Sequence, residues 1–358
     1  HFPLFCYLVD CGFNASIINP IITHSTKNGN IRKVKNDKID SKGIAKLGLS
    51  KDIPVSQFPA KLVLELRSLT RKYYDLTDER SAHINKLKGD LHTVFPQYLD
   101  VFCDVTGKTS TMILRQYGTP DKILRGHKKT MIEKISKASR KGLAKASERY
   151  EKLCAAANAA KTFGCQIDSI YFNIFLTLDL VEKLDSALDS ILNRIRQLIT
   201  FNKNEKFIQQ IKLLNTIPGV GFLTAVTIMC EIGDFSAFRN PKQLFAYFGL
   251  DPEVNESGKF VGTQLHMSKR GSRIARRAIF AVALASIRTK RNGEGINPYL
   301  RKYYELKSGQ KPKMVAIGAV MHKVCNIVFA VLRDEKAFEL RSPEEHCKQY
   351  QRPALAAA

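Results

Sequence analysis

Two serines in a strongly basic stretch are the residues whose type and setting best suit chemistry. Ser268 and Ser272 lie in the segment HMSKRGSR, and between Ser257 and Gly293 the chain has nine Lys or Arg residues and no Asp or Glu. Uncompensated cationic segments of this kind bind polyanions. A serine in such a loop is a candidate for more than helix capping, and the basic helix that follows Ser272 must position it.

Two carboxylates form a second candidate site. Asp37 and Asp40 lie three residues apart in the segment NDKIDSKGIAKLGL, which the pattern predicts to open as a helix. Side chains at i and i+3 share a helical face, so both carboxylates can approach one divalent metal ion. The alternative is structural, because acidic residues in the first turn of a helix complement its dipole. The spacing leaves both interpretations open.

A glycine-rich turn is the third candidate, as a contact for a nucleic-acid backbone. The segment IPGVG lies between two apolar stretches that predict helices. It resembles the helix–hairpin–helix motif, in which such a turn exposes backbone N–H groups at a helix N-terminus to a phosphate oxygen. We therefore expect nucleic-acid contacts at Pro218, Gly219, Val220 and Gly221. The alternative is an ordinary helical hairpin, since many of these use glycine.

The overall charge favours nucleic acid as the partner. The chain has 57 Lys or Arg residues against 33 Asp or Glu, which gives a formal net charge of +24. Phosphate neutralisation is the commonest use of so many cations. An anionic membrane surface is the rival partner, but we find no apolar run that approaches the roughly 20 residues of a spanning helix. We expect no membrane partner.

The cysteines and the chain start indicate compartment and completeness. The eight cysteines form no CxxC pair and no Cys/His cluster with the spacing of zinc ligands. No secretory signal is visible, so we expect reduced cysteines in a cytoplasmic protein. The chain begins at His1, inside an apolar helical pattern, and we expect it to be a fragment whose start lies upstream.

Hydrophobic patterning predicts α/β structure at the N-terminus, followed by a long helix. Residues 1–20 read as the end of a helix, a turn at Gly12 and a short strand, ASIIN. Residues 58–94 carry an apolar stripe at helical spacing. The other face of this helix carries Arg67 and Arg71, where we expect RNA to bind.

The middle of the chain predicts a linker and a basic helical run. After Pro96 we expect an irregular linker that holds Gly107, Gly118 and Pro120. Residues 122–152 read as helix with eleven cations against three acids. That bias suits RNA, with contacts at positions such as Lys128 and Lys129. A solvated helix face explains the charge equally well.

A heptad seam follows the basic run. Apolar residues recur with 3-4-3-4-3 spacing at Val181, Leu184, Leu188, Ile191, Ile195 and Leu198. This pattern suits a coiled coil, formed either by a homodimer or by antiparallel pairing within the chain. A plain bundle helix is the alternative.

The order of the motifs resembles one family over roughly residues 1–333. The segments NDKID, TIPGVGFLTA, LFAYFGLDP and MSKRGSRIARRAIF, with the basic helix and the heptad seam between them, are similar to insertion-sequence transposases. That family pairs an N-terminal RuvC-like domain, which has a DEDD acidic set, with a C-terminal transposase domain that bears a serine. Its members are recombinases guided by a bridge RNA.

The resemblance implies a RuvC-like, RNase H-like fold in which four carboxylates hold Mg²⁺. Only the last two match here, as Asp37 and Asp40, because the first Asp and the Glu would fall before His1. We therefore expect half of that metal site in this chain. Two carboxylates with water bind Mg²⁺ only weakly, so we expect this fragment to be inactive in cleavage without the upstream part of the site.

The resemblance also implies a serine nucleophile that attacks a DNA phosphodiester and forms a phosphoserine linkage. Ser268 matches that position, and Ser272, the alternative, is expected to be the N-cap of the following helix. Cations can stabilise the charge on the attacked phosphate. We expect this role for Lys269, Arg270, Arg273, Arg276 and Arg277.

These expectations combine into one architecture. We expect a truncated RuvC-like α/β domain followed by mostly α structure, with the boundaries 1–57 for the RuvC-like part, 58–125 for the helix and linker that complete it, 126–200 for the coiled-coil region, 201–333 for the transposase domain and 334–358 for a mobile tail.

The expected function is RNA-guided cleavage and exchange of donor and target DNA, by a homo-oligomer, dimer or tetramer, that associates with the nucleoid when on DNA. The acidic set of one subunit would work with the serine of another. The alternatives are a RuvC-like metal nuclease that forms no covalent intermediate and a catalytically dead nucleic-acid-binding remnant.

Overall fold

The computed structural model describes residues 2–13, 15, 37–49, 60–163, 165, 167–203, 205–253, 256–257, 260–261, 266–342 and 344–345. The chain divides into two compact units, residues 1–61 and 62–358. Regular structure in the described ranges is helical, apart from one short antiparallel hairpin of β1 (Glu256–Ser257) and β2 (Phe260–Val261). The mostly α character expected for the larger part of the chain is confirmed.

The first unit contributes two described helices. Helix α1 (Phe2–Asp10) ends in a turn at Gly12, whose φ of +83° lies in the left-handed region that glycine adopts most easily. Helix α3 (Asp37–Gly48) begins at Asp37, so both predicted carboxylate positions fall in its first turn. The predicted strand ASIIN lies outside the described residues except for Ala15.

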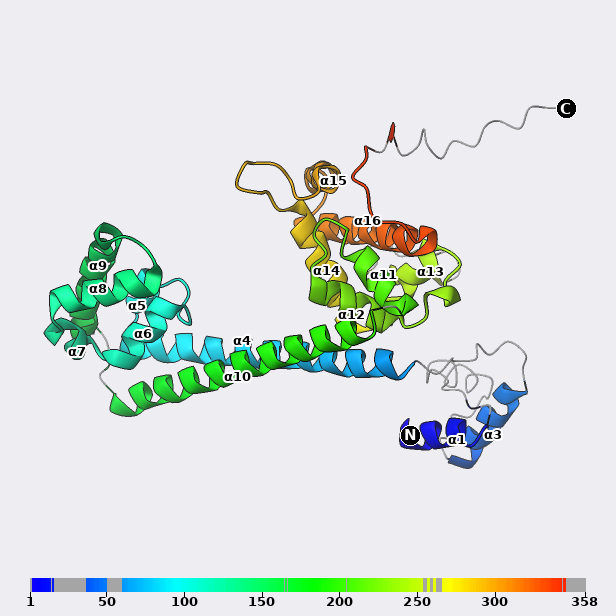
Figure 1. Ribbon diagram of the computed structural model, residues 1–358, viewed down its shortest axis with the longest axis horizontal. Coiled ribbons are helices and arrows are strands. Elements are labelled where there is room, and N and C mark those ends of the chain that lie inside the picture. Colours follow the sequence, from blue (N-terminus) through cyan, green and yellow to red (C-terminus); the bar gives the residue numbers. More distant parts are fainter. Residues whose placement is uncertain are drawn as a thin grey trace. The chain divides into compact units, whose positions relative to one another are not determined.

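The second unit contains a pair of long helices, α4 (Lys61–Val94) and α10 (Asp168–Phe201), which lie side by side in Figure 1. Arg80 pairs with Asp185 at 2.5 Å, and the Tyr171 hydroxyl donates to the Val94 carbonyl at 3.4 Å. Because the residue number rises on one helix as it falls on the other, the pair is antiparallel.

The predicted heptad seam lies on α10 and is largely buried within the chain. Val181, Leu188, Ile195 and Leu198 are each at most 8% exposed. Leu66 of α4 belongs to the same hydrophobic cluster as Ile195. Of the pairings predicted from the heptads, the one within the chain is therefore the one that this structure contains.

A helical lobe with its own core joins the end of α4 to the start of α10 (Figure 1). Its helices are α5 (Tyr98–Val101), α6 (Lys108–Gln116), α7 (Pro120–Arg125), α8 (Lys128–Ser139) and α9 (Leu143–Phe163). The expectation of an irregular linker after Pro96 is wrong. Gly107 and Thr119 are helix N-caps and Pro120 opens α7, so these residues begin helices instead of marking coil.

The basic run at 122–152 is helical, as predicted, but it is not one helix. It includes the end of α7, all of α8 and the start of α9. Arg140 closes α8 with a φ of +52°, and Lys141 and Gly142 lead into α9.

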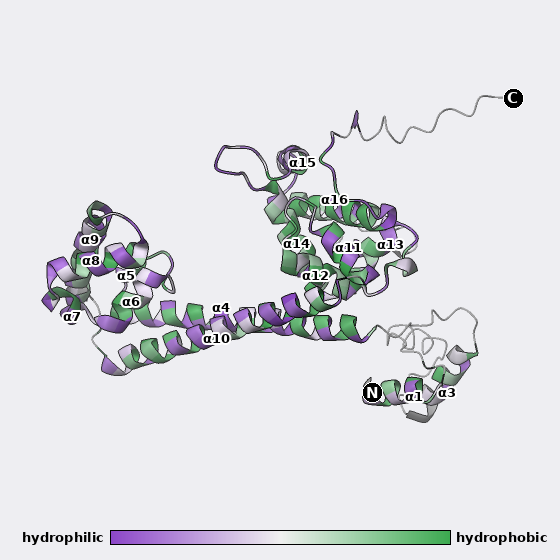
Figure 2. Ribbon diagram, viewed as in Figure 1, coloured by the Kyte–Doolittle hydropathy of each residue, from purple (hydrophilic) through white to green (hydrophobic). Residues whose placement is uncertain are grey.

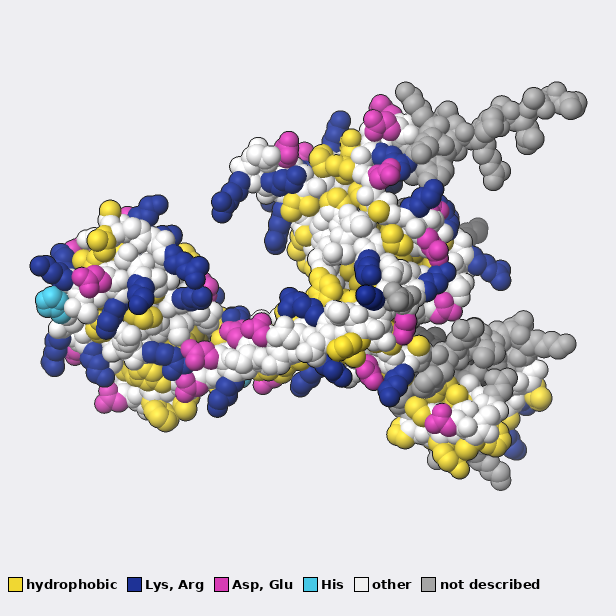
Figure 3. Space-filling model, in the orientation of Figure 1, with side chains coloured by type: hydrophobic (Ala, Val, Ile, Leu, Met, Phe, Trp, Pro, Cys, Tyr) yellow, Lys and Arg dark blue, Asp and Glu magenta, His cyan; other side chains and the backbone are white. Residues whose placement is uncertain are grey.

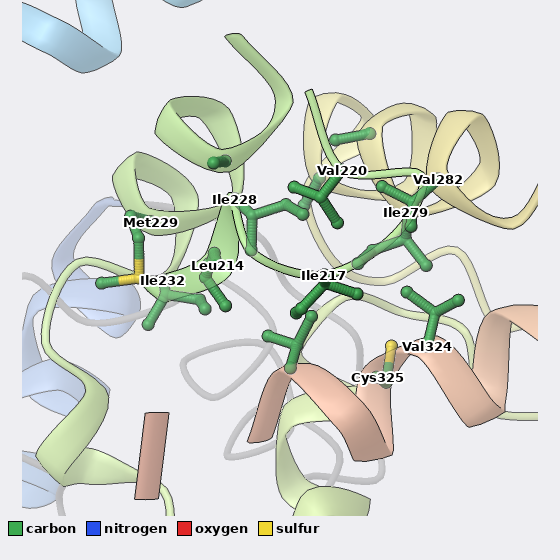
Figure 4. Packing of buried hydrophobic residues seen from close by; sticks show 14 of the residues in the cluster. Leu214, Ile217, Val220, Ile228, Met229, Ile232, Ile279, Val282, Val324 and Cys325 are labelled. Atoms are coloured by element: carbon green, nitrogen blue, oxygen red, sulfur yellow. The ribbon is translucent and has the colours of Figure 1, made fainter. Parts of the chain in front are cut away.

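The other lobe holds the second core. It consists of α11 (Lys206–Leu214), α12 (Phe222–Ile232), the 3₁₀ turn η2 (Phe235–Ala237), α13 (Pro241–Tyr247), α14 (Arg273–Ile287), α15 (Pro298–Ser308) and α16 (Lys313–Asp334). Figure 4 shows Ile217 and Ile228 near Ile279 of α14 and Val324 of α16. Hydrophobic residues run along α12, α14 and α16 in Figure 2. These helices fix the loop that carries Ser268.

Helix α16 corrects the expectation about apolar runs. It is the one helix in the described ranges that is long and apolar enough to cross a membrane by length and composition, and 56% of its apolar window is buried inside the protein. It packs against α13, α14 and α15 as a core helix. Residues beyond it also pack, because the Phe338 N–H donates to the Thr216 hydroxyl at 2.8 Å. The expected mobile tail therefore does not begin at residue 334.

Candidate functional site

The loop that carries Ser268 is bonded along its backbone to the segment that follows α13. Glu253 N–H donates to the His266 carbonyl at 2.7 Å, and Ser268 N–H donates to the Asp251 carbonyl at 2.8 Å. Lys269 N–H donates to the Gly249 carbonyl at 3.0 Å. The serine is thus held on a short two-stranded arrangement, and its position is set by the backbone.

The Ser268 side chain has a specific partner. Its hydroxyl donates to Asp251 Oδ1 at 2.6 Å, and both residues are half-buried. A carboxylate at this distance can accept the hydroxyl proton when the serine oxygen attacks. Asp251 was not among the site residues predicted from the sequence. The only signal for it was its place in the motif LFAYFGLDP, because a separation of 17 positions from Ser268 follows no helix or strand period.

Two glycines allow the segments on either side of this pair to touch. Gly249 has a φ of +65°, and a Cβ on it would lie 2.4 Å from the Gly271 nitrogen. A Cβ on Gly271 would lie 2.0 Å from the Tyr247 carbonyl oxygen. Side chains at either position would therefore push the Ser268 loop away from Asp251.

Arg276 fastens the same two segments. Its Nη1 donates to the carbonyls of Gly271 at 2.6 Å, Lys269 at 3.1 Å and Phe248 at 3.2 Å. Burial lowers the pKa of its guanidinium from the usual value. Nη1 of Arg276 is therefore engaged by the backbone of the loop, and a contact between Arg276 and phosphate stays a prediction.

Ser272 is a helix cap, as its position predicted. It is the N-cap of α14, and its hydroxyl accepts the Ala275 N–H at 3.2 Å. The hydroxyl therefore serves as a helix cap.

Glu231 is the centre of a buried ion pair between α4 and α12. Its side chain is 2% exposed, and Arg71 donates to its two oxygens at 2.8 and 2.9 Å. Burial alone would raise the pKa of this carboxyl, but the hydrogen bonds from Arg71 and Ser272 outweigh it and hold the pKa below its usual value. Arg67 donates to the Cys230 carbonyl at 2.7 Å. Arg67 and Arg71, predicted to bind RNA, thus tie two helices together.

Arg273 and Arg277, two more of the predicted phosphate contacts, face α4. Arg273 and Arg277 approach the two oxygens of Asp78 at 3.2 and 2.7 Å. Arg277 also lies over the Tyr74 ring, 4.8 Å from its centroid. Because Arg273 and Arg277 share the single negative charge of Asp78, the three side chains together keep a net positive charge. Lys269 and Arg270 are exposed beside it, so the surface next to Ser268 is cationic.

The glycine-rich turn joins α11 to α12 as a helical hairpin. Gly219 has a φ of +97°, and the Ser286 hydroxyl of α14 donates to the Pro218 carbonyl at 3.0 Å. Val220 is buried, whereas Gly221 caps the N-terminus of α12 without a side-chain hydrogen bond. The N–H groups of the first turn of α12 have no partner within the helix. This geometry suits a backbone phosphate and also serves a plain hairpin.

Two lysines of the other lobe were also predicted to bind nucleic acid. Lys128 pairs with Glu151 at 2.7 Å and lies 5.7 Å from the centroid of the Tyr150 ring. Lys129 is exposed. Figure 3 shows many dark blue side chains on the lobe formed by α5 to α9.

The predicted carboxylate pair can be placed only by its backbone. Asp37 and Asp40 occupy the first turn of α3, and their side chains lie outside what the structure describes. In the described ranges no group of three or more His, Cys, Asp or Glu residues could hold a metal ion. Carboxylates are the ligands that Mg²⁺ prefers, so the donor chemistry of the two residues fits that ion.

Two family models match the chain. Residues 211–305 match the transposase family of IS116, IS110 and IS902, and residues 1–96 match a DEDD transposase model of IS110. The first match contains the turn, the Ser268 loop and α14, and the second contains α3. These two segments of the chain are therefore similar to transposase domains of these insertion elements.

Curated relatives agree with this assignment. The chain is 23% identical over 286 residues to the insertion element IS110 43.6 kDa protein of Streptomyces coelicolor, which covers 79% of this chain and 66% of that protein. It is 30% identical over 177 residues to the pilin gene-inverting protein of Moraxella bovis, covering 49% of this chain and 52% of that protein. It is 26% identical over 188 residues to the transposase for insertion sequence element IS1111A of Coxiella burnetii, covering 51% of this chain and 50% of that protein.

Proposed function

We propose, from the premise that two segments of this chain are similar to transposase domains of the IS110, IS116 and IS902 elements, that the protein rearranges DNA by cutting strands and rejoining them. The observation that carries the proposal is the Ser268 hydroxyl, which donates to Asp251 at 2.6 Å beside a cationic surface. The relatives named for transposition and for gene inversion support it, because both outcomes require strand exchange.

The proposed chemistry proceeds in two transfers. Asp251 accepts the Ser268 proton while the serine oxygen attacks a DNA phosphorus. A P–O bond of the backbone breaks, and its oxygen leaves as a DNA hydroxyl after it takes up the proton. The phosphate remains linked to Ser268. A hydroxyl from another DNA strand then attacks that phosphorus, which frees the serine and joins the new strand. Lys269 and Arg270 stabilise the charge on the attacked phosphate.

Asp37 and Asp40 would hold Mg²⁺, an ion that, when bound, polarises a phosphate oxygen. We further propose that the protein acts as a dimer or tetramer, in which the acidic residues of one subunit act with the serine of another. We also propose that a bridge RNA guides the protein and contacts Lys128 and Lys129. Support for these parts comes from the motif order and from the match of residues 1–96 to a DEDD transposase model.

The covalent linkage gives the direct test. The protein is incubated with labelled element-end DNA, its guide RNA and Mg²⁺, and a denaturing gel separates DNA that carries protein from free DNA. Ser268→Ala should abolish the linked species and leave DNA binding nearly unchanged. Ser272→Ala is the matched control and should retain it. A linked species that persists in Ser268→Ala would overturn the assignment, and peptide mapping would then identify the residue.

A second candidate function rests on the DEDD match alone. In it the protein is a RuvC-like metal nuclease that cuts DNA by hydrolysis. This candidate predicts cut products with free ends and no attached protein, in the wild type as well as in Ser268→Ala. The same gel therefore separates the two functions.

A further inference from the structure

We propose that residues 288–297, which we call the finger, bind duplex DNA by entering its major groove. The finger connects α14 to α15 and protrudes from the lobe in Figure 1. Its sequence is RTKRNGEGIN, with three cations and one acid. The role rests on the proposed function, because a protein that rearranges DNA must hold the duplex.

The finger is a hydrogen-bonded hairpin. Ile296 N–H donates to the Arg288 carbonyl at 2.8 Å, and Lys290 N–H donates to the Glu294 carbonyl at 2.7 Å. Between these bonds Thr289 and Gly295 form an antiparallel bridge. A hairpin with this ladder presents its side chains in a fixed geometry, which lowers the entropy lost when it binds.

The tip of the hairpin is a tight turn. Gly293 N–H donates to the Lys290 carbonyl at 3.0 Å, and Gly293 has a φ of +86°. A type I turn followed by a left-handed glycine is a common three-residue hairpin loop. The turn places Arg291 and Asn292 at the end of the hairpin, where both are exposed.

The charge of the finger is positive and accessible. Arg288, Lys290 and Arg291 are exposed, and among the described residues no acid lies within ion-pair distance of Arg288 or Arg291. Glu294 accepts from Asn292 at 2.9 Å and lies 3.9 Å from Lys290, a long contact. Figure 3 shows dark blue side chains along this loop.

The base of the finger is anchored to the glycine-rich turn. Asn297, 2% exposed, donates its N–H to the Ser286 carbonyl at 3.0 Å. The Ser286 hydroxyl bonds to Pro218, and a Cβ on Gly219 would lie 2.5 Å from that hydroxyl. The finger and the glycine-rich turn are thus both hydrogen-bonded to Ser286 of α14. A duplex whose backbone contacts the turn can therefore also contact the finger.

The width of the hairpin favours DNA over double-stranded RNA. The major groove of B-form DNA is about 12 Å wide and admits a two-stranded β-ribbon. The major groove of A-form RNA is deep and too narrow for side chains to read. In the DNA groove, Arg288 and Lys290 would meet phosphates along the sides, and Arg291 would reach base edges.

The experiment measures binding by the full chain with Ser268→Ala, so that no covalent product forms. The finger variant carries Arg288→Gln, Lys290→Gln and Arg291→Gln. The matched control removes three exposed lysines elsewhere on the same lobe, with Lys302→Gln, Lys311→Gln and Lys313→Gln. Fluorescence anisotropy follows a mixed-sequence DNA duplex, an RNA duplex of the same sequence, and a DNA duplex whose cytosines carry glucosylated hydroxymethyl groups that fill the major groove.

We expect the finger variant to bind the DNA duplex at least tenfold more weakly than the control variant, and its salt dependence to fall by about two to three ion equivalents. Its RNA-duplex affinity should match that of the control. Glucosylation should weaken the wild type and leave the finger variant unchanged. The proposal is overturned if both variants lose equal affinity, if RNA binding falls as much as DNA binding, or if glucosylation affects the finger variant as strongly as the wild type.

A variant that fails to fold is recognised by the loss of its cooperative thermal transition. In that case Gly293→Ala replaces it, because this change strains the turn and keeps every charge. It should weaken DNA-duplex binding, and unchanged binding overturns the proposal. If the covalent-linkage test fails but the finger variant still loses DNA-duplex affinity, the proposed serine chemistry is overturned and the role of the finger in binding DNA stands.

Discussion

Asp251 is the residue on which the proposed serine chemistry depends most. A serine hydroxyl at neutral pH is a poor nucleophile, and the carboxylate at 2.6 Å is the group that can take its proton. Arg276 and the two close-packed glycines hold the two segments together, so the pair is preorganised. This placement is a property of the folded loop and could not be read from spacing along the chain.

Replacement of Asp251 by Asn should slow formation of the protein–DNA linkage. The amide keeps a hydrogen bond to Ser268 but cannot accept the proton, so we expect a loss of about 10²- to 10⁴-fold in rate. Single-turnover assays would measure it. Glu253→Gln, an exposed carboxylate two residues away, is the control. Equal rates in the two variants would remove Asp251 from the mechanism.

The Glu231–Arg71 pair makes a prediction about stability. Glu231→Gln leaves the Arg71 charge without its partner, and a broken buried pair costs roughly 3–5 kcal/mol. Because the Arg71 side chain is 52% exposed, water compensates in part, and we expect about 2 kcal/mol. Urea denaturation at neutral pH measures this difference.

The same pair predicts how stability changes with pH. The folded pKa of Glu231 lies below the ordinary value of 4.5, so its contribution is present above that pH and is lost as pH falls through the folded pKa. The gap in unfolding free energy between wild type and Glu231→Gln should therefore narrow below pH 4.5. A gap that widens on acidification would contradict the ion-pair interpretation.

At the scale of elements, hydrophobic patterning missed the short helices after Pro96 and merged parts of α7, α8 and α9 into one basic run. The linker expected after Pro96 contains α5, α6 and α7, because Gly107, Thr119 and Pro120 each sit at a helix start. Long periodic segments were predicted well, and α4 matches its predicted stripe. Short helices carry too few periods to show a face, so their packing against α8 and α9 decided their structure.

The glycine-rich turn can be tested with two neighbouring glycines. Gly219→Ala forces a side chain onto a φ of +97° and within 2.5 Å of the Ser286 hydroxyl, so we expect a loss of about 1–3 kcal/mol in stability. Gly221 has a φ of −84° and nothing within 4 Å of an added Cβ. Gly221→Ala should therefore change stability by less than about 0.5 kcal/mol. Equal effects in thermal denaturation would show that the contact between the turn and α14 is weak.

At the scale of the whole molecule, the larger unit has two separate hydrophobic cores that share the α4–α10 pair. Heptad spacing predicted the seam but could not choose its partner, since a homodimer and an intrachain pair bury the same stripe. The choice was made by α4, whose own apolar stripe pairs with α10. The candidate site divides similarly, because Ser268 was predicted from the resemblance of its motif and Ser272 from its place before a helix, while Asp251 required the fold.

Two leucines on α10 test this pairing. Leu188 lies in the seam and is 8% exposed, whereas Leu180, two turns earlier, is 43% exposed. Leu188→Ala should cost about 2–4 kcal/mol, and Leu180→Ala less than about 1 kcal/mol, because only the first leaves a cavity. Since the cavity lies within one chain, the loss from Leu188→Ala should not depend on protein concentration, and the sedimentation coefficient should match that of the wild type. A destabilisation that vanishes at high protein concentration would mean that the seam joins two copies of the chain.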